Sequence, residues 1–317
     1  MLGVFFYRHW VPTGRGLNVT EILKRNLILW FLAGVSTLSV PRHTTGDDAR
    51  DSPTASQVDR MFPDSFQRWI VAHRGVSDVC PENTRAAFEA AVAGAADAIE
   101  FDVQLTGDDQ VVVCHDTVLD RYGHASVKIA ETSLSVLKQL DIGSWLSGTF
   151  ADQRLLTLDE LLESFSKSCP LLLEVKASEL SPDKIQILID AIVDAIRQRN
   201  ISSTVAVLCF DCSVLESIHA IAPEISLVLN TNQPETLTAA KLASMPWLTA
   251  VDGKISQLTP QIVQLIHNSG LVSSCFTCND VEDVIKAWDI GVSAIITNHP
   301  ERTRQILKQH KRLPHDS

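Results

Sequence analysis

Two acidic residues, Glu100 and Asp102, are separated by one position and could hold a metal ion together. They lie in residues 98–105, where apolar and polar residues alternate as is typical of a β-strand. Side chains alternate along a strand with a period of two, so both carboxylates point to the same side. His115 follows after a short polar turn. A histidine beside paired carboxylates indicates proton transfer next to a bound cation.

Other charged side chains also follow strand-like runs. His73 and Arg74 come at the end of residues 70–73, and Glu174 and Lys176 at the end of residues 171–176. Arg74 could serve only in a structural ion pair, and Glu174 could bind only Lys176. Buried strands rarely carry charges without a partner or a ligand, and such local pairs leave the first acidic pair and the two histidines unexplained. The set as a whole predicts a metal-assisted phosphoryl site.

Each residue type has a role in that chemistry. Carboxylate oxygens are the ligands that Mg²⁺ and Ca²⁺ prefer, and such a metal polarises a phosphoryl oxygen as a Lewis acid. Two histidines can act as general base and general acid on opposite sides of phosphorus. Arg74 and Lys176 would neutralise the charge that builds up in the transition state. Gly75 is expected to let the backbone approach a ligand closely.

The elements that must position these residues alternate between strand and helix from residue 69 onward. This alternation over roughly 235 residues predicts a parallel sheet closed into a (β/α)8 TIM barrel, which carries its chemistry at the carboxyl ends of the strands. The nine predicted strands are 70–73, 98–105, 111–115, 171–176, 205–210, 226–230, 250–253, 272–277 and 294–297. The predicted helices are 84–93, 133–140, 158–166, 182–199, 213–221, 236–244, 259–268 and 281–288.

Nine strands are one more than a barrel needs. The extra strand is explained if 98–105 and 111–115 form a hairpin across the turn formers of residues 106–110. In that register His115 returns close to Phe101, between the two carboxylates. The alternative is that both runs are barrel strands and a later run is not.

Composition excludes several functions. The chain has 317 residues, of which 45% are hydrophobic, so it can bury a full core, and its formal charge of -11 argues against a nucleic-acid surface. Seven cysteines are too few and too scattered for a disulfide scaffold. The pairs Cys209/Cys212 and Cys275/Cys278 are too far apart for a zinc ribbon, and the members of each pair should face opposite sides of a strand. Ordinary core or strand-end cysteines are therefore expected.

Residues 1–67 differ from the remainder. Residues 27–40 form an apolar run preceded by Lys24 and Arg25, too short for a typical spanning helix but suited to a signal peptide or a marginal anchor. The segment predicts membrane association or entry into the secretory pathway. An organelle-targeting peptide and a mis-assigned gene start are the alternatives. Residues 43–66 are predicted to be a polar linker, and the catalytic domain is expected to occupy residues 68–317.

At the charged residues the chain resembles the glycerophosphodiester phosphodiesterase family over residues 70–304, about three quarters of its length. The resemblance rests on ordered segments distributed through that range. These are Ala72-His73-Arg74-Gly75, Pro81-Glu82-Asn83-Thr84, Glu100-Phe101-Asp102-Val103, His115-Asp116, Leu119-Asp120-Arg121, Thr157-Leu158-Asp159-Glu160, Leu173-Glu174-Val175-Lys176 and Ile295-Ile296-Thr297.

The resemblance implies a TIM barrel with a small insertion at residues 117–154, and hydrolysis of a glycerophosphodiester to glycerol 3-phosphate and an alcohol with a divalent metal, Mg²⁺ or Ca²⁺. Attack by water and attack by the glycerol 2-hydroxyl through a cyclic phosphate both stay open. The implied roles are metal ligation by Glu100, Asp102 and Glu174, acid and base catalysis by His73 and His115, and phosphate contact by Arg74 and Lys176.

The substrate is less closely specified. Phe276-Thr277 stands where the family commonly has Thr-Trp, and Thr297-Asn298 where it has Thr-Asp, which affects substrate fit more than chemistry. Water-soluble headgroup diesters are the first expectation. A lysophospholipase D acting on lysolipids or N-acyl glycerophosphoethanolamines is the alternative, and an apolar groove for it could be lined by Trp145, Leu146 and Phe150, whose other role would be core packing. A non-catalytic membrane or partner-binding module is a third, disfavoured by the intact set of histidines and carboxylates.

Overall fold

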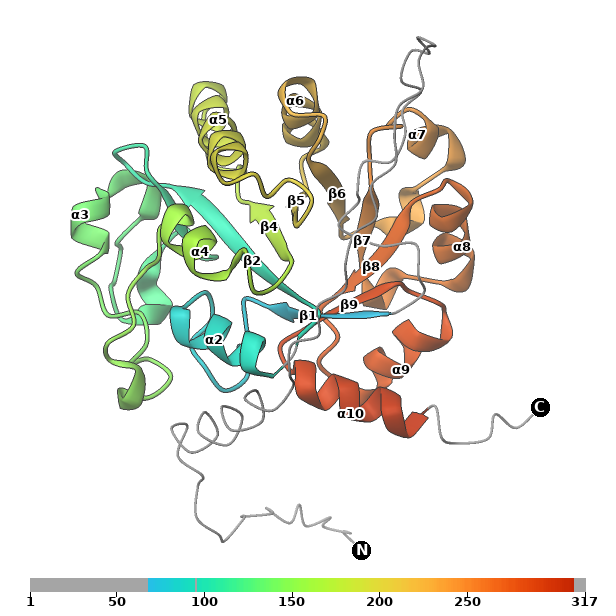
Figure 1. Ribbon diagram of the computed structural model, residues 1–317, viewed down its shortest axis with the longest axis horizontal. Helices are drawn as coiled ribbons and strands as arrows, with labels where there is room; N and C mark the ends of the chain where they lie inside the picture. The colour runs from blue at the N-terminus through green and yellow to red at the C-terminus, as the bar shows by residue number, and fades with distance from the viewer. Residues whose placement is uncertain (1–67, 95, 311–317) are drawn as a thin grey trace, which may run out of the picture. The chain divides into compact units, whose positions relative to one another are not determined.

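The computed structural model describes residues 68–94 and 96–310 (Figure 1). The predicted targeting segment and linker, residues 1–67, lie outside the described residues. Within the described ranges no helix combines the length and the apolar character that crossing a membrane requires. The predicted location of the protein therefore stays a prediction.

Eight parallel strands form a closed ring, which confirms the predicted (β/α)8 TIM barrel. β1 pairs with β9 on one side and with β2 on the other, so the sheet has no free edge within the ring. The eight strands are β1 (Trp69–His73), β2 (Ala98–Leu105), β4 (Leu171–Val175), β5 (Val205–Cys209), β6 (Ser226–Thr231), β7 (Ala250–Lys254), β8 (Val272–Phe276) and β9 (Ala294–Thr297).

The remaining strand, β3 (Val111–Val113), lies outside the ring and runs antiparallel to β2. Val113 pairs with Val103, and the amide of Thr106 donates to the carbonyl of Gln110 across the turn at 2.9 Å. The predicted hairpin is confirmed, and the alternative in which both runs are barrel strands is wrong. The register brings the segment after β3 back along β2 toward the acidic pair.

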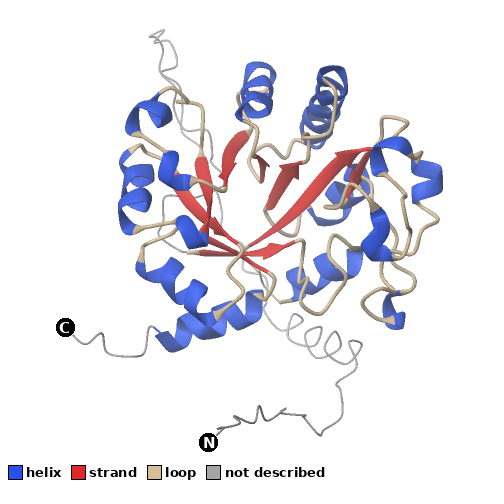
Figure 2. Ribbon diagram, turned by 180° about the vertical axis from the view of Figure 1, so that it is seen from behind, coloured by secondary structure: helices blue, strands red, loops and turns tan. Residues whose placement is uncertain are grey.

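Helices cover the outside of the barrel, with the strands inside (Figure 2). Several begin where side chains satisfy the first free amides, as at Thr157, which forms a capping box with Glu160, and at Ser181, which precedes Pro182. The helices are α2 (Arg85–Ala93), α3 (Leu134–Leu137), α4 (Leu158–Phe165), α5 (Pro182–Arg199), α6 (Cys212–Ile221), α7 (Ala239–Ala243), α8 (Pro260–Asn268), α9 (Val281–Asp289) and α10 (Pro300–His310).

Helix α10 was not among the predicted helices, and α3 and α7 are shorter than predicted. In α10 the buried residues are Pro300, Thr303 and Leu307, so the apolar stripe is too thin to stand out in the sequence. In α5 the buried residues include Ile189, Ile192 and Ile196, which repeat at the spacing of one helix face.

The interior of the barrel has its own apolar cluster, which shows which way the strand residues point. Its members include Val71 on β1, Ala98 on β2 and Leu172 on β4. Because side chains alternate along a strand, residues two or four positions later on these strands face the same interior. His73, Glu100, Asp102 and Glu174 are those residues, so all four point into the carboxyl-terminal mouth of the barrel.

The segment that joins β3 to α4 covers the predicted insertion, residues 117–154. It contains α3 and three short 3₁₀ helices, η1 (Leu119–Tyr122), η2 (Ile129–Glu131) and η3 (Gly148–Phe150). Its apolar side chains pack into a small separate cluster with one face of the hairpin. That cluster contains Val112, Cys114, Leu119, Tyr122, Ile129, Leu137, Ile142 and Leu155.

The paired cysteines do not behave alike. The sulfur atoms of Cys275 and Cys278 lie 3.3 Å apart, so the expectation that they face opposite sides is wrong. The reason is that β8 ends at Phe276 and the chain leaves the strand before Cys278. The Cys209 thiol instead meets the carbonyl of Val175, and the Cys212 thiol meets the sulfur of Met245.

Candidate active site

Three carboxylates meet at the mouth of the barrel. Glu100, Asp102 and Glu174 each offer an oxygen within 4.8 Å of the other two, and Asp102 and Glu174 are direct register partners on β2 and β4. The three residues are only 2%, 0% and 9% exposed. In the described part of the chain, Oε1 of Glu100 is buried without a hydrogen-bond partner. A buried acceptor of this kind beside two further carboxylates fits a hard divalent cation.

The electrostatics of the trio agree with that fit. Burial and the neighbouring carboxylates raise the pKa of Glu174 to about 7 and the pKa of Glu100 well above its usual range. The pKa of Asp102 is lowered despite its burial, because Arg74 and Lys176 stabilise its charged form. A divalent cation would relieve the mutual repulsion of the three groups.

Arg74 and Lys176 both contact the central carboxylate. The Arg74 Nε lies 3.1 Å from Oδ2 of Asp102, and the Lys176 Nζ lies 3.0 Å from Oδ1. Lys176 also pairs with Glu174, so the local salt bridge considered from the sequence exists but is one part of a larger network. The two cations reach Asp102 through different oxygens, and both stand at the edge of the carboxylate trio where a phosphate could be held.

Arg74 adopts a left-handed backbone conformation, with φ 56°, and its amide donates to Oε2 of Glu100 at 3.0 Å. Gly75 is also left-handed, with φ 81°. A Cβ at this position would lie 2.6 Å from the carbonyl carbon of Ala87 in α2. Gly75 is therefore needed for close packing of the loop on a helix; its part in the approach to a ligand stays a prediction.

His73 ends β1 directly beside Glu100, its register partner on β2. Its Nδ1 lies 2.6 Å from Oδ1 of Asn298, so Nδ1 carries the proton and donates it to the amide oxygen. The Nε2 atom is left for chemistry. Burial and the charge of Arg74 lower the pKa of His73 to about 4, which keeps the ring neutral and able to accept a proton.

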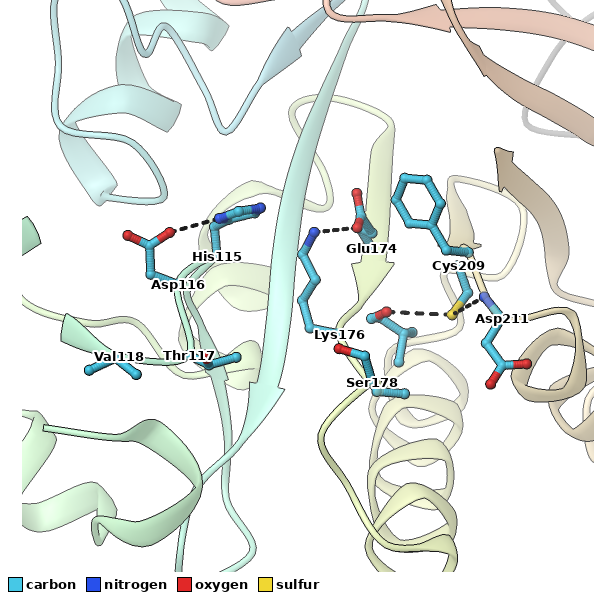
Figure 3. Close-up of a pocket in the computed structure, with 12 residues that line it drawn as sticks. His115, Asp116, Thr117, Val118, Glu174, Lys176, Ser178, Cys209 and Asp211 are labelled. Atoms are coloured by element: carbon cyan, nitrogen blue, oxygen red, sulfur yellow. Dashed lines mark hydrogen bonds and ion pairs between the residues drawn. The ribbon is translucent and has the colours of Figure 1, made fainter. Parts of the chain in front are cut away.

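His115 follows β3, the outer strand of the hairpin. The amide of Cys114 donates to the carbonyl of Asp102 at 3.0 Å, which brings His115 to the carboxylate trio as the predicted register requires. Its Nδ1 lies 2.8 Å from Oδ1 of Asp116 and, because a carboxylate only accepts, must be protonated. Figure 3 shows Asp116 on the opposite side of the ring from Lys176 and Glu174.

A pocket of about 640 Å³ opens from His115, Glu174 and Lys176 toward the outside of the mouth (Figure 3). Its outer wall includes Phe210, which is 43% exposed. The ring of Phe210 meets the ring of Phe276 edge to face at a centroid distance of 5.8 Å. Residues Val118, Ala177 and Ser178 complete much of the remaining wall.

Trp145, Leu146 and Phe150, predicted to line an apolar groove, do not line the pocket beside His115. The ring of Trp145 packs edge to face on Tyr122 at 6.0 Å, and its indole nitrogen donates to the carbonyl of Ile142. Trp145 is 37% exposed, so it packs on Tyr122 without belonging to the core. Leu146 is 38% exposed.

Neutral amides around the site were not identified from the sequence as functional residues. Asn83 donates to Oδ2 of Asp102 at 2.8 Å, and Gln104 donates to the carbonyls of Cys114 and Asp116 at 2.9 and 3.0 Å. These contacts hold Asp102, a candidate metal ligand, and the His115 loop. Asn83 lies in a segment of the family resemblance, but a search for charged residues passes over it.

Comparisons with known proteins point in one direction. The sequence pattern of the glycerophosphoryl diester phosphodiesterase family matches residues 73–302. YhdW of Bacillus subtilis (strain 168) is 32% identical over 235 residues, covering 74% of this chain and 95% of YhdW. A glycerophosphodiester phosphodiesterase of the same organism is 28% identical over 267 residues, covering 80% of this chain and 90% of the relative.

Solved structures agree with the sequence relatives. A phosphodiesterase of Oleispira antarctica, solved in complex with its product sn-glycerol-3-phosphate, is 28% identical with a TM-score of 0.70, covering 77% of this chain and 98% of that one. A structure from Silicibacter pomeroyi, 22% identical with a TM-score of 0.71 and covering 80% and 97%, supports the fold. The chain therefore belongs to the glycerophosphoryl diester phosphodiesterase family and is a phosphodiesterase.

Proposed function

We propose that this chain hydrolyses small glycerophosphodiesters to glycerol 3-phosphate and an alcohol, with a divalent cation held by Glu100, Asp102 and Glu174. The observation that carries the proposal is the buried carboxylate trio with an unpartnered oxygen on Glu100, within the described residues, beside two histidines. Family membership and the product bound to the relative from Oleispira antarctica support it.

The two histidines divide the proton transfers. His73 is neutral, with Nδ1–H held by Asn298, and its Nε2 accepts the proton of the attacking hydroxyl. His115 donates its Nδ1–H to the Asp116 carboxylate, and its Nε2 delivers a proton to the leaving oxygen. These roles are the same whether the attacking hydroxyl belongs to water or to the glycerol 2-position.

The charged groups around the carboxylates bind and orient the phosphate. Arg74 and Lys176 face Asp102 from two sides, and both are placed to contact the non-bridging phosphate oxygens, where charge increases in the transition state. A bound Mg²⁺ or Ca²⁺ would act as a Lewis acid toward one of these oxygens. Removal of the metal is therefore expected to abolish turnover.

The pocket beyond His115 is proposed to hold the alcohol portion of the substrate. Its volume suits a headgroup such as choline or inositol. A lysolipid is not favoured, because Trp145, predicted to line an acyl groove, packs on Tyr122 and does not line the pocket beside His115. Membrane association through residues 1–67 stays a prediction.

The direct test measures the choline or inositol released from glycerophosphocholine, glycerophosphoinositol and lysophosphatidylcholine, with and without EDTA, together with the glycerol 3-phosphate released from the first two. We expect the two water-soluble diesters to be hydrolysed, with turnover lost in EDTA and restored by Mg²⁺ or Ca²⁺. Turnover that survives complete metal removal would contradict the metal assignment. Faster turnover of the lysolipid would make the enzyme a lysophospholipase D.

The acid and base roles are tested by His73→Ala and His115→Ala. Each variant is expected to lower kcat about 10²- to 10⁴-fold, as loss of a general acid or base does, while its circular dichroism spectrum stays unchanged. His219→Ala is the matched control, because His219 stacks on Trp247, with ring centroids 5.6 Å apart, and lies on α6. A near-normal kcat in either active-site variant would overturn the role of that histidine.

A further inference from the structure

Arg121, in the segment between β3 and α4, binds two carboxylates that come from different loops of the barrel mouth. Its Nε donates to Oδ2 of Asp116 at 2.8 Å. Its Nη1 and Nη2 donate to the two oxygens of Glu82 at 2.9 and 2.6 Å. Glu82 lies between β1 and α2, whereas Asp116 follows β3. One guanidinium therefore joins two loops that no strand pairing connects directly.

The other oxygen of Asp116 holds the acid/base histidine. Oδ1 accepts the proton on Nδ1 of His115, so the chain of contacts runs from Arg121 through Asp116 to the ring. With Nδ1 used in this way, Nε2 is the ring atom that remains for the substrate. The direction of the His115 ring depends on the position of the Asp116 carboxylate, and Arg121 fixes that position.

The arrangement needs a cation at this point. Ligand atoms of Glu82, His115 and Asp116 lie within 4.8 Å of one another. Without the guanidinium, the carboxylates of Glu82 and Asp116 would repel each other and separate. The pKa values of both carboxyl groups are lowered although burial opposes this, because hydrogen bonds and charge from Arg121 stabilise the ionised forms.

Arg121 is itself restrained by aromatic side chains. Its guanidinium carbon lies 4.8 Å from the ring centre of Tyr122 and 5.2 Å from that of Trp145, and Nη2 contacts the Tyr122 hydroxyl at 2.9 Å. Tyr122 belongs to the small apolar cluster of this segment. The segment thus presents a fixed cation to the catalytic site from a core of its own.

We propose that Arg121 is a positioning residue for catalysis, which acts through Asp116 to hold His115 with Nε2 facing the phosphoryl group. This inference rests on the proposed role of His115.

Arg121 has a second route to the site, through Glu82. Glu82 also binds Arg74 at 3.0 Å, and Arg74 is a proposed phosphate contact. The two routes differ in their dependence on His115: a loss of kcat that acts through His115 disappears when His115 is absent, whereas a loss that acts through Arg74 stays.

A double-mutant cycle on the full chain separates them. Arg121→Met is made in the wild-type enzyme and in His115→Ala, and kcat and KM are measured with glycerophosphocholine in the presence of Mg²⁺. In the wild-type background we expect kcat to fall about 10- to 100-fold with KM changed less than about threefold. In the His115→Ala background the same substitution is expected to lower kcat less than about threefold, because the residue through which it acts is already gone.

Two further variants keep the result interpretable if Arg121→Met is unstable. Asp116→Asn leaves the Glu82 contact intact and should reproduce most of the loss of kcat. Arg121→Lys should give an intermediate kcat, since a lysine keeps the charge but cannot bind two carboxylates in a fork. Arg85→Met is the control: Arg85 also lies over an aromatic ring, that of Phe165, and its loss should leave kcat unchanged.

Equal losses of kcat in both backgrounds, or a raised KM with kcat unchanged, would overturn the inference. The proposed function is tested separately by the His115→Ala variant alone. Should that variant keep a near-normal kcat, the role of His115 fails. Should it lose activity while Arg121→Met adds its full effect on top, only the positioning role fails.

Discussion

Two walls of the barrel interior each carry an almost fully buried aspartate, yet the two walls have opposite electrostatic character. On β2, Asp102 is fully buried and contacts two cations, Arg74 and Lys176. On β7, Asp252 is 1% exposed, accepts a hydrogen bond from the Ser274 hydroxyl at 2.7 Å and faces the negative charge of Glu174. The two aspartates are equally buried, but Asp102 lies beside positive charges and Asp252 beside a negative one.

The difference shows that neighbouring cations, and not burial, decide which carboxyl stays ionised. The pKa of Asp102 is lowered although burial opposes it. Burial raises the pKa of Asp252 to about 8, so this group is protonated in the folded protein at neutral pH. One wall thus carries the charged groups that the proposed cation and phosphate require, whereas Asp252 on the other wall is neutral.

The largest expected effect is on the charged wall. Glu100→Gln removes one of the three proposed ligands, and we expect kcat to fall about 10³-fold. Titration calorimetry with Mg²⁺ or Ca²⁺ should show the binding isotherm of the wild-type protein lost or strongly weakened. Asp252→Asn on the opposite wall is the matched control and should bind metal as the wild type does. Equal weakening in both variants would remove the contrast between the walls.

A smaller effect is expected on stability at the neutral wall. In the unfolded chain Asp252 ionises near its usual pKa of about 4, but in the folded protein it ionises near 8. The group therefore stabilises the fold least at high pH: its contribution is fully present below pH 4 and is lost as the pH rises toward 8. Asp252→Asn removes this dependence while the amide oxygen can still accept from Ser274.

Urea unfolding from pH 4.5 to pH 8 measures the effect. The free energy of unfolding of Asp252→Asn should match that of the wild type near pH 4.5 and exceed it near pH 8 by on the order of a few kcal/mol, since each pKa unit corresponds to about 1.4 kcal/mol. A variant that is equally destabilised at both ends of the range would show that Asp252 is ionised in the folded protein.

The smallest expected effect concerns the rim between the two walls. Phe210 and Phe276 extend from β5 and β8 and meet edge to face at the mouth. Phe210→Ala is expected to raise KM for glycerophosphocholine about 3- to 10-fold with kcat little changed, because an aromatic contact contributes about 1 kcal/mol. Phe210→Leu should recover part of the affinity. An unchanged KM would show that the alcohol portion of the substrate does not reach this rim.

Much of the fold followed from patterns that act locally. Buried parallel strands are short aliphatic runs, and α5 repeats its apolar residues at the spacing of a helix face, so both were predicted closely. The hairpin of β2 and β3 was found because its turn is rich in Gly and Asp. Helix α10 was missed, because its packing on its neighbours does not require a wide apolar stripe.

The charged residues of the site were also predicted from a local signal, whereas its neutral residues were not. Charges on buried strands are costly, so Glu100, Asp102 and Glu174 stood out in the sequence. Neutral amides such as Asn83 and Gln104 carry no such signal, since their role appears only when the atoms they bind are in place. Gly75 was singled out for approach to a ligand, but only the structure shows that a glycine is required there because the loop packs closely on α2.

The sequence alone determined the barrel, the hairpin and the identities of the charged residues, because periodicity, turn composition and the cost of burying charge are all properties of neighbouring positions. The tertiary structure decided which charges face one another. It showed that Asp102 has two cationic partners whereas Asp252 faces a carboxylate, and that Arg121 contacts Asp116 and Glu82 together. Such contacts join residues far apart in the chain, and the Coulomb energy that gives them their effect depends on distances that only the folded chain sets.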